Sequence, residues 1–217
     1  MISVVTINKN NRDGLRKTIE SVINQTYFDN IEYIIIDGGS TDGSIGVIEE
    51  YGDKIAYWVS EPDGGIYSAM NKGVDVSNGE YSIFLNSGDY FCTNYVMQKI
   101  ALHLDKDIVY GDEYKIKNEN NKYLSKYPDK LDESFFRKTA LPHQSSLIRT
   151  SLLKENKYSE EWKLLGDWKF FREMIMEKGA TYKHVPIAIS CYGLDGVSTI
   201  QRKVHEDEKK EYYKKVC

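Results

Sequence analysis

Residues 81–91, Tyr-Ser-Ile-Phe-Leu-Asn-Ser-Gly-Asp-Tyr-Phe, give the clearest indication of how this chain folds. The first half of this stretch is an apolar run typical of a buried strand. Its second half turns abruptly to small and polar residues and reaches an acidic one at Asp89. Open α/β sheets bind ligands at the carboxyl ends of their strands, so we expect Asp89 to face a divalent metal or a substrate proton. An ordinary strand-to-helix turn, with Asp89 as a turn or cap residue, is the alternative interpretation.

The pattern of a strand that ends in acidic and glycine residues occurs twice more upstream. Hydrophobic periodicity predicts amphipathic helices between four strands, at residues 2–7, 31–36, 55–59 and 81–85. Strands and helices that alternate through short links predict an α/β fold with a mostly parallel central sheet. The C-terminal ends of parallel strands lie at one edge, so Asp37, Asp63 and Asp89 should gather there. Glycines beside Asp37 and Asp63 would let the backbone approach a ligand closely.

Beyond residue 91 the pattern is less regular. We predict a hairpin, two helices and a β-rich run there, followed by a charged and solvated helix over residues 201–217. No internal repeat or low-complexity linker separates the two regions. We therefore predict one domain over residues 1–217, made of a first half (1–91), a second half (92–200) and the helical tail.

Composition excludes several classes of protein. A hydrophobic fraction of 41% argues for a globular chain, and a net charge of −4 argues against nucleic acid as a partner. Three scattered cysteines are too few for a disulfide framework and favour a reducing compartment. We see no signal peptide and no apolar run near the ~20 residues that span a bilayer, so we expect a cytoplasmic location.

Four segments together resemble the signatures of glycosyltransferase family 2, whereas the dinucleotide and P-loop fingerprints are absent. They are Ser3-Val4-Val5-Thr6, Asp37-Gly38-Gly39-Ser40-Thr41-Asp42-Gly43, Gly65-Ile66-Tyr67-Ser68-Ala69-Met70-Asn71-Lys72-Gly73 and Leu85-Asn86-Ser87-Gly88-Asp89. The match is to the branch that builds bacterial surface polysaccharides, of the colanic-acid transferase type.

The resemblance implies a GT-A fold in which the first half binds a nucleotide-diphosphate sugar, linked to UDP or GDP. The second half would form a mixed α+β acceptor side. The implied reaction transfers the sugar, with inversion at the anomeric carbon, to a saccharide hydroxyl. A lipid-linked oligosaccharide acceptor would bring the protein to the inner face of the membrane.

A divalent metal, Mg²⁺ or Mn²⁺, is expected to balance the negative charge of the leaving nucleoside diphosphate. The family's usual pattern here is Asp-x-Asp followed by a further Asp. This chain has Asn86 and Gly88 at the first and third positions, so only Asp89 remains as an acidic metal ligand. Mg²⁺ often needs only one or two carboxylates besides substrate phosphates, so we still expect metal use.

The resemblance also implies a set of substrate-binding residues. These are Thr6, Asp37 and Asp63 for the nucleotide, Asn71 and Asn86 within the matching segments, and His143 near the acceptor or the metal. Asp residues at strand ends also cap turns, and a single His is commonly structural, so structural roles stay open for these residues.

An acceptor hydroxyl needs a base that takes its proton as it attacks. The segment Leu165-Gly166-Asp167-Trp168 resembles the family's Glu-Asp motif, with Gly166 in place of the Glu. Asp167 is therefore the expected base, and a helix N-cap is its alternative role. Residues 193–198 resemble a loop that closes over the donor in this fold.

Two other functions stay open at this stage. A sugar nucleotidyltransferase also uses acidic strand ends, but it would want a glycine-rich basic loop after the first strand, where this chain has only Gly14. A catalytically weak carbohydrate- or nucleotide-binding module would account for the changes at Asn86 and Gly88.

Overall fold

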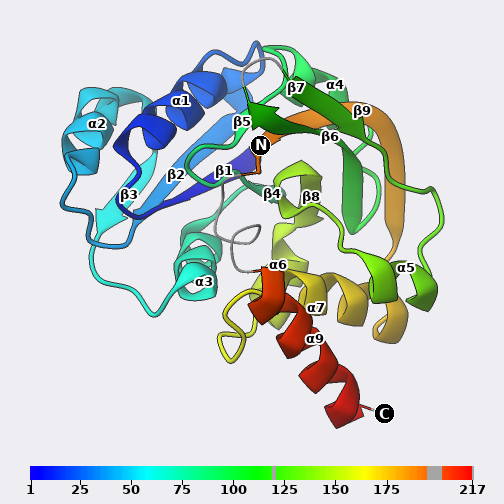
Figure 1. Cartoon of the computed structure of the whole chain (residues 1–217). Coiled ribbons are helices and arrows are strands. Elements are labelled where there is room, and N and C mark those ends of the chain that lie inside the picture. Colours follow the sequence, from blue (N-terminus) through cyan, green and yellow to red (C-terminus); the bar gives the residue numbers. More distant parts are fainter. Residues whose placement is uncertain (119–120, 195–201, 217) are drawn as a thin grey trace.

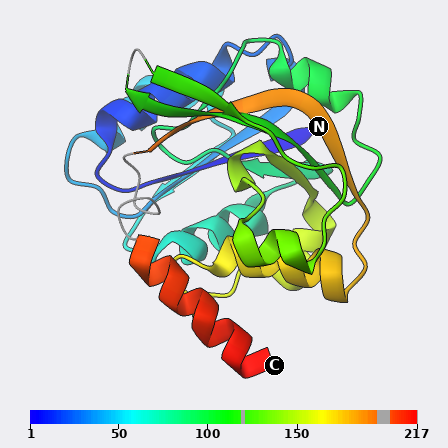
Figure 2. The same ribbon diagram turned by 45° about the vertical axis from the view of Figure 1, so that its right-hand side comes forward.

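A single mixed sheet with helices on both faces forms the molecule (Figures 1 and 2). The computed structural model describes residues 1–118, 121–194 and 202–216, apart from the side chains of residues 202 and 216. Its strands are β1 (Ile2–Asn8), β2 (Ile31–Asp37), β3 (Tyr57–Ser60), β4 (Tyr81–Phe84), β5 (Tyr90–Phe91), β6 (Ile108–Asn118), β7 (Asn121–Ser125), β8 (Ser146–Arg149) and β9 (Tyr182–Gly193). Its α-helices are α1 (Arg12–Ile23), α2 (Ser44–Glu50), α3 (Ile66–Val76), α4 (Val96–Ala101), α5 (Glu133–Lys138), α6 (Thr150–Asn156), α7 (Gly166–Arg172) and α9 (Arg202–Val216).

The sheet has the order β3-β2-β1-β4-β8-β6-β9-β5, and β7 pairs with β6 outside this path. Strand β1 runs parallel to β2 and β4, and β2 runs parallel to β3. These four strands therefore end at one edge, as predicted. Strand β8 then enters antiparallel between β4 and β6, while β9 is parallel to β6. The predicted α/β class is confirmed, with a mixed second region.

Two hydrophobic cores lie on opposite faces of the sheet. Helices α1, α2 and α4 pack in one core, and α3, α5, α6, α7 and α9 pack in the other (Figure 1). Strand β1 serves both, because Val4 belongs to the first core and Val5 to the second, each with no exposed surface. Alternate strand residues point to opposite faces, so an uninterrupted apolar run is needed to fill both cores.

Two predicted boundaries differ from the structure. The third strand begins at Tyr57 instead of residue 55, although Ile55 is buried in the core just before it. The helix predicted over residues 162–177 begins only at Gly166, and its last part, Glu173–Glu177, is a π-helical turn. Trp162 and Leu164 are nevertheless buried in the segment before this helix, so apolar periodicity there reflects packing and not helix.

The C-terminal tail is a helix, as predicted, but the expectation of a solvated helix is wrong for one of its faces. Tyr212 is only 2% exposed, and its ring lies 5.2 Å from that of Trp168 in α7. The hydroxyl of Tyr212 accepts a hydrogen bond of 2.9 Å from Arg172. Helix α9 therefore covers the face formed by α7 (Figure 2).

No helix within the described ranges has both the length and the apolar composition required to cross a membrane.

Candidate active site

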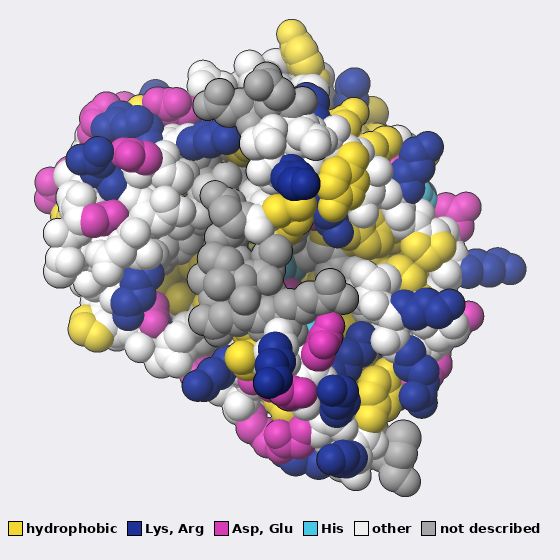
Figure 3. All heavy atoms as spheres, viewed as in Figure 1, with side chains coloured by type: hydrophobic (Ala, Val, Ile, Leu, Met, Phe, Trp, Pro, Cys, Tyr) yellow, Lys and Arg dark blue, Asp and Glu magenta, His cyan; other side chains and the backbone are white. Residues whose placement is uncertain are grey.

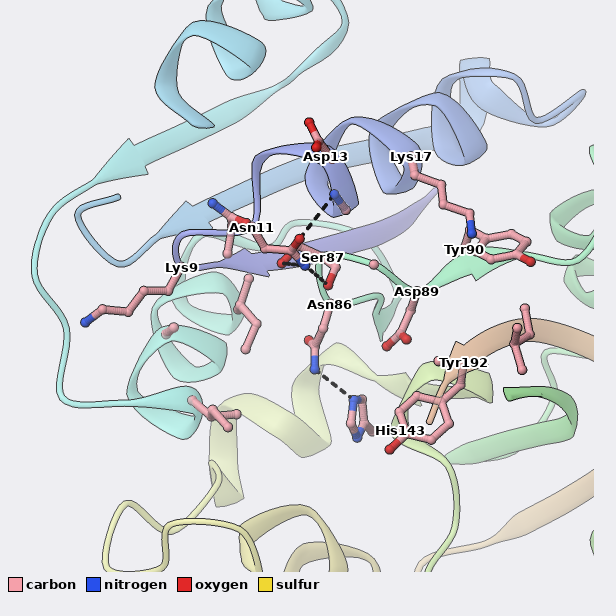
Figure 4. Close-up of a pocket in the computed structure, with 18 of the residues that line it drawn as sticks. Lys9, Asn11, Asp13, Lys17, Asn86, Ser87, Asp89, Tyr90, His143 and Tyr192 are labelled. Atoms are coloured by element: carbon pink, nitrogen blue, oxygen red, sulfur yellow. Dashed lines mark hydrogen bonds between the residues drawn. The ribbon is translucent and has the colours of Figure 1, made fainter. Parts of the chain in front are cut away.

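A pocket of about 1600 Å³ opens at the edge where the parallel strands end (Figure 4). Its walls come from the loops after β1, β3 and β4, the start of α1, the strand β5 and the β6–β7 hairpin. Four of the predicted site residues line it, namely Asp63, Asn86, Asp89 and His143. The expectation that acidic strand ends gather at one edge is confirmed for Asp63 and Asp89, whereas Asp37 does not line the pocket. His143 enters from the turn His143–Ser145 that precedes β8.

The turn after β4 carries Asn86 and Asp89 into the pocket. Gly88 adopts a positive φ of 105°, which a residue with a side chain would resist. The hydroxyl of Thr18 in α1 fixes both sides of the turn, accepting from Gly88 N at 2.9 Å and donating to Asp89 O at 2.7 Å. Asp89 is 7% exposed, and Figure 4 shows its carboxylate directed into the cavity. The turn is thus held in place before any ligand binds.

Asp37 holds the loop after β2 in place through hydrogen bonds to its carboxylate. Its carboxylate accepts hydrogen bonds from the side chains of Asn8 (2.7 Å), Ser40 (2.6 Å) and Ser60 (2.6 Å), and from two backbone amides. Burial works to raise the pKa of Asp37, but these hydrogen bonds outweigh it and lower that pKa. Asp37 is fully buried and is not among the residues that line the pocket.

Asp63 is half-buried and lies beside this loop. A Cβ atom on Gly38 would lie 2.6 Å from Asp63 Oδ2, so the Asp63 carboxylate occupies the space that a side chain at position 38 would need. The Asp63 side chain also accepts a hydrogen bond of 3.0 Å from Gly65 N. This gives a physical reason for glycine at position 38.

A hydrogen-bonded chain leads from the pocket wall to Asp167. Asn86 Nδ2 lies 3.1 Å from His143 Nε2, and His143 Nδ1 lies 2.9 Å from Asp167 Oδ2. A carboxylate only accepts, so Nδ1 must carry the proton, and Nε2 of the neutral ring then accepts from Asn86. His143 lines the pocket (Figure 4). Asp167 is not among the lining residues.

Asp167 is held from its other side as well. Its Oδ1 accepts hydrogen bonds from the Tyr67 hydroxyl at 2.9 Å and from Trp168 N at 2.8 Å. Burial works to raise the pKa of Asp167, but its contact with His143 and these donors outweigh burial and lower that pKa. For His143, burial works to lower the pKa, and the charges of Asp167 and Asp89 reverse the shift and raise it. The pair is thus an oriented imidazole backed by a carboxylate.

Gly166 stands where the family has a Glu, and Tyr67 explains the change. A Cβ atom on Gly166 would lie 2.7 Å from the Tyr67 ring. A larger residue at position 166 would push that ring away from Asp167, so the hydrogen bond between Tyr67 and Asp167 requires glycine there.

Four predicted residues lie outside the pocket lining, namely Thr6, Asp37, Asn71 and Asp167. Thr6 is fully buried, with its hydroxyl 3.1 Å from that of Tyr33. Asn71 joins α3 to the backbone of Tyr158, donating at 2.9 Å and accepting at 2.9 Å. A substrate contact by Thr6, Asp37 or Asn71 stays a prediction from the resemblance. Of the loop predicted at residues 193–198, only Gly193 and Leu194 are described, and Gly193 lines the pocket; the rest lies outside the described residues.

Sequence reasoning missed several residues of the site. Tyr67 lies inside a quoted segment, but its bond to Asp167 spans 100 positions. Tyr90 and Lys17 line the pocket, and the Lys17 ammonium lies 3.8 Å from the centre of the Tyr90 ring (Figure 4). Cys92 and Cys191, treated as scattered, bring their sulfur atoms to 3.2 Å across the β5–β9 pair. No local signal pairs these residues.

The residues at the turn after β4 fit a divalent cation, although the described residues contain no cluster of three or more His, Cys, Asp or Glu side chains. Asn86 Oδ1 is buried and has no hydrogen-bond partner. Asp89 lies on the same turn and offers carboxylate oxygen. Mg²⁺ and Mn²⁺ prefer such oxygen ligands, and substrate phosphates can complete their coordination.

Comparison with known families gives a match over most of the chain. The model of "Glycosyl transferase family 2" matches residues 3–179. An uncharacterized glycosyltransferase of Mycobacterium tuberculosis is 34% identical over 176 residues, which are 78% of this chain and 66% of the relative. A PGL/p-HBAD biosynthesis glycosyltransferase of Mycobacterium bovis is 24% identical over 200 residues, 88% of this chain and 76% of that protein. The chain thus spans just under two thirds of the first relative.

Solved structures share the fold at low identity. TarS of S. aureus in complex with UDP-GlcNAc superposes with a TM-score of 0.74 at 18% identity, covering 92% of this chain and 60% of that one. The mannosyltransferase PcManGT from Pyrobaculum calidifontis, in complex with GDP-Man and Mn²⁺, gives a TM-score of 0.72 at 13% identity, with 94% and 60% covered. At these identities the likeness concerns the fold alone.

Proposed function

Because the chain belongs to glycosyltransferase family 2, we propose that it transfers a sugar from a nucleoside-diphosphate donor to a saccharide hydroxyl, with inversion. The observation that carries this proposal is the single pocket that collects Asp63, Asn86, Asp89 and His143 at the ends of the parallel strands. The complexes of TarS with UDP-GlcNAc and of PcManGT with GDP-Man support a donor linked to UDP or GDP.

In this proposal the nucleotide lies over the loops after β1, β2 and β3. Asp63 would accept hydrogen bonds from the base or ribose, since its carboxylate is at the pocket wall. Asp37 would act below it by holding the loop of Gly39 and Ser40 in one conformation. Thr6, which is fully buried, would support the base of the nucleotide site.

Asp89 and Asn86 would hold a divalent cation together with the donor diphosphate. When bound, Mg²⁺ or Mn²⁺ neutralises the negative charge that develops on the departing nucleoside diphosphate. The unpaired Asn86 Oδ1 supports this role, because a buried acceptor without a partner costs ~1–3 kcal/mol until something occupies it.

We propose that the acceptor proton passes to His143 Nε2. The acceptor hydroxyl would take the place of the Asn86 amide at Nε2, and its oxygen would attack the anomeric carbon on the face opposite the leaving group. Asp167, the base expected from the sequence, would work through His143 by fixing the tautomer that leaves Nε2 free to accept. It would also stabilise the imidazolium that forms.

The acceptor and the cellular role are proposed from the same family. An oligosaccharide on a lipid carrier, in the synthesis of a bacterial surface polysaccharide, fits the branch that the motifs resemble. A cytoplasmic protein that touches the inner membrane surface would meet such an acceptor.

A screen of nucleotide sugars tests the proposal. The melting temperature would be measured with UDP- and GDP-linked sugars, with Mn²⁺, with Mg²⁺ and with EDTA, because a ligand of the folded state raises it. We expect one donor class to stabilise the protein and to release its nucleoside diphosphate slowly in the presence of metal. Asp89→Asn should lose the metal-dependent part of both signals.

Two outcomes would contradict it. Release of pyrophosphate from a nucleoside triphosphate and a sugar 1-phosphate would identify a nucleotidyltransferase. Stabilisation by a sugar or nucleotide without any release would identify a binding module.

A further inference from the structure

Three lysines surround one end of the pocket. Lys17 comes from α1, Lys117 from β6 and Lys122 from β7, and all three line the cavity with Tyr90 and Tyr192. In Figure 4, Lys17 and Tyr90 lie at the opposite end from Lys9, with Asn86 and Asp89 between them. The lysine end is thus distinct from the end near β1 and β3 where the nucleotide is proposed to bind.

Among the described residues, no carboxylate forms an ion pair with these lysines, although the protein carries a net charge of −4. Other exposed cations do find acids, as Lys72 does with Glu61 at 2.8 Å. Lys17 and Lys122 instead lie against tyrosine rings, at 3.8 and 5.1 Å from the ring centres of Tyr90 and Tyr114.

Lys17 and Lys122 act on the same place from two elements. A hydrogen bond with Cys92 is the main cause that lowers the pKa of the Cys191 thiol to about 7, and the charges of Lys122 and Lys17 add to it. Cys191 is the strand partner of Tyr90, whose ring faces the pocket. Both ammonium groups therefore raise the electrostatic potential beside Tyr90.

The size of the pocket leaves this end for a second substrate. At about 1600 Å³ it exceeds the ~300–1,000 Å³ of a typical small-molecule site. A donor diphosphate at Asp89 would have a cation of its own, so it would not need three further lysines. Lysine is a common point-charge ligand of phosphate, and the tyrosine faces beside it suit a sugar ring.

We propose that Lys17, Lys117 and Lys122 form an anionic subsite for the acceptor, which binds a phosphate or diphosphate ester carried by the acceptor saccharide. The proposal rests on the proposed function and narrows its acceptor to a phosphorylated class. The ester has two sources, a lipid diphosphate or a water-soluble sugar phosphate, and both present the same charged oxygens to the lysines.

The test compares two double variants. The pocket variant is Lys17→Gln/Lys122→Gln, and the control is Lys138→Gln/Lys154→Gln. The control removes the same charge from two exposed lysines outside the pocket that form no ion pair with a described residue. With the donor from the nucleotide-sugar screen, acceptors would be a short-chain polyprenyl diphosphate sugar, the same sugar 1-phosphate and its methyl glycoside. A panel of glucose, galactose and N-acetylglucosamine covers the unknown sugar.

We expect at least one phosphorylated acceptor to exceed its methyl glycoside in kcat/KM by about tenfold or more. The pocket variant should raise the KM of that acceptor by about tenfold, with the donor KM unchanged and the control like wild type. The preferred ester then identifies the lipid or the soluble source. Equal use of the methyl glycoside, or a rise in the donor KM instead, would overturn the subsite.

A binding measurement keeps the subsite testable if no transfer is found. Inorganic pyrophosphate would be titrated calorimetrically into the protein in EDTA. Binding that weakens about tenfold in the pocket variant, and not in the control, supports the subsite even if the proposed reaction fails. Pyrophosphate affinity that is the same in all three proteins refutes it. The subsite is also refuted if the pocket variant keeps its pyrophosphate affinity and loses only its sedimentation with phosphatidylglycerol vesicles, because the lysines would then bind a membrane.

Discussion

Asp167→Asn is the substitution that tests the proposed proton path most directly. The change keeps the size of the side chain and removes the negative charge behind His143. The new amide can present its Nδ2 hydrogens to His143 Nδ1, which lies 2.9 Å from Oδ2 in the wild type. His143 Nδ1 would then accept, and the ring proton would move to Nε2, which faces the pocket. An Nε2 that already carries a proton cannot take one from the acceptor.

The expected loss follows from that change of tautomer. General-base catalysis contributes ~10²–10⁴ in rate, or ~3–5.5 kcal/mol of transition-state stabilisation. We expect kcat for transfer to fall by about this factor, while the donor KM stays near the wild-type value. Asp167 raises the pKa of His143, and the base must be neutral. Wild-type activity should therefore increase as the pH rises through the His143 pKa. Any residual activity of the variant should also increase with pH, but with its midpoint at a lower pH, because the charge of Asp167 no longer raises that pKa.

Nucleoside-diphosphate release with the donor from the thermal-shift screen measures kcat, and the melting temperature with donor reports binding. Tyr67→Phe is the matched control, because it removes one hydrogen bond of 2.9 Å to Asp167 and leaves the contact with His143. That variant should lose ~1.5–3 kcal/mol of stability, because the bond is made to a carboxylate, and keep most of its activity. If Asp167→Asn transferred sugar at the wild-type rate, or lost donor binding as fully as transfer, the assignment would be wrong.

Three further predictions concern the residues around the site. Asp37→Asn should lower the free energy of unfolding by about 1.5–3 kcal/mol, since hydrogen bonds to the buried carboxylate are lost. Because folding lowers the pKa of Asp37, this difference should persist above the unfolded value of ~3.9 and close as the pH falls below it, in urea titrations at several pH values. A constant difference down to pH 2 would contradict it. Gly166→Ala should lower the free energy of unfolding by ~1–3 kcal/mol, because the new Cβ would meet the Tyr67 ring. Gly46→Ala is the control and should cause no such loss, because the space around its Cβ is open. Equal melting temperatures for the two variants would count against this packing. Oxidation with diamide should form a disulfide between Cys92 and Cys191 and remove two thiols from a thiol titration. The Cys92→Ser variant should not show this loss. If both thiols of the wild type persist, the result argues against their contact.

Local sequence signals were enough to predict the first four strands, most of the helices and the edge at which we propose that ligands bind. Apolar runs and helical stripes are local signals, and they predicted that β1 to β4 run parallel because short crossovers leave few topologies. The acidic residues that follow those strands were therefore predicted at one edge before any contact was known. Asp63 and Asp89 line the pocket there, whereas Asp37 is buried beneath its loop.

The tertiary structure alone decided which residues meet. Strand β8 enters between β4 and β6 and sets His143 beside the turn after β4, 57 positions from Asn86. Asp167 meets that histidine because α7 packs against α3, where Tyr67 fills the space left by Gly166. Periodicity shows which face of an element is buried, but it carries no information about the partner on the other side. Packing chooses that partner, so the Asp167–His143 pair and the lysines of the anionic subsite became visible only in three dimensions.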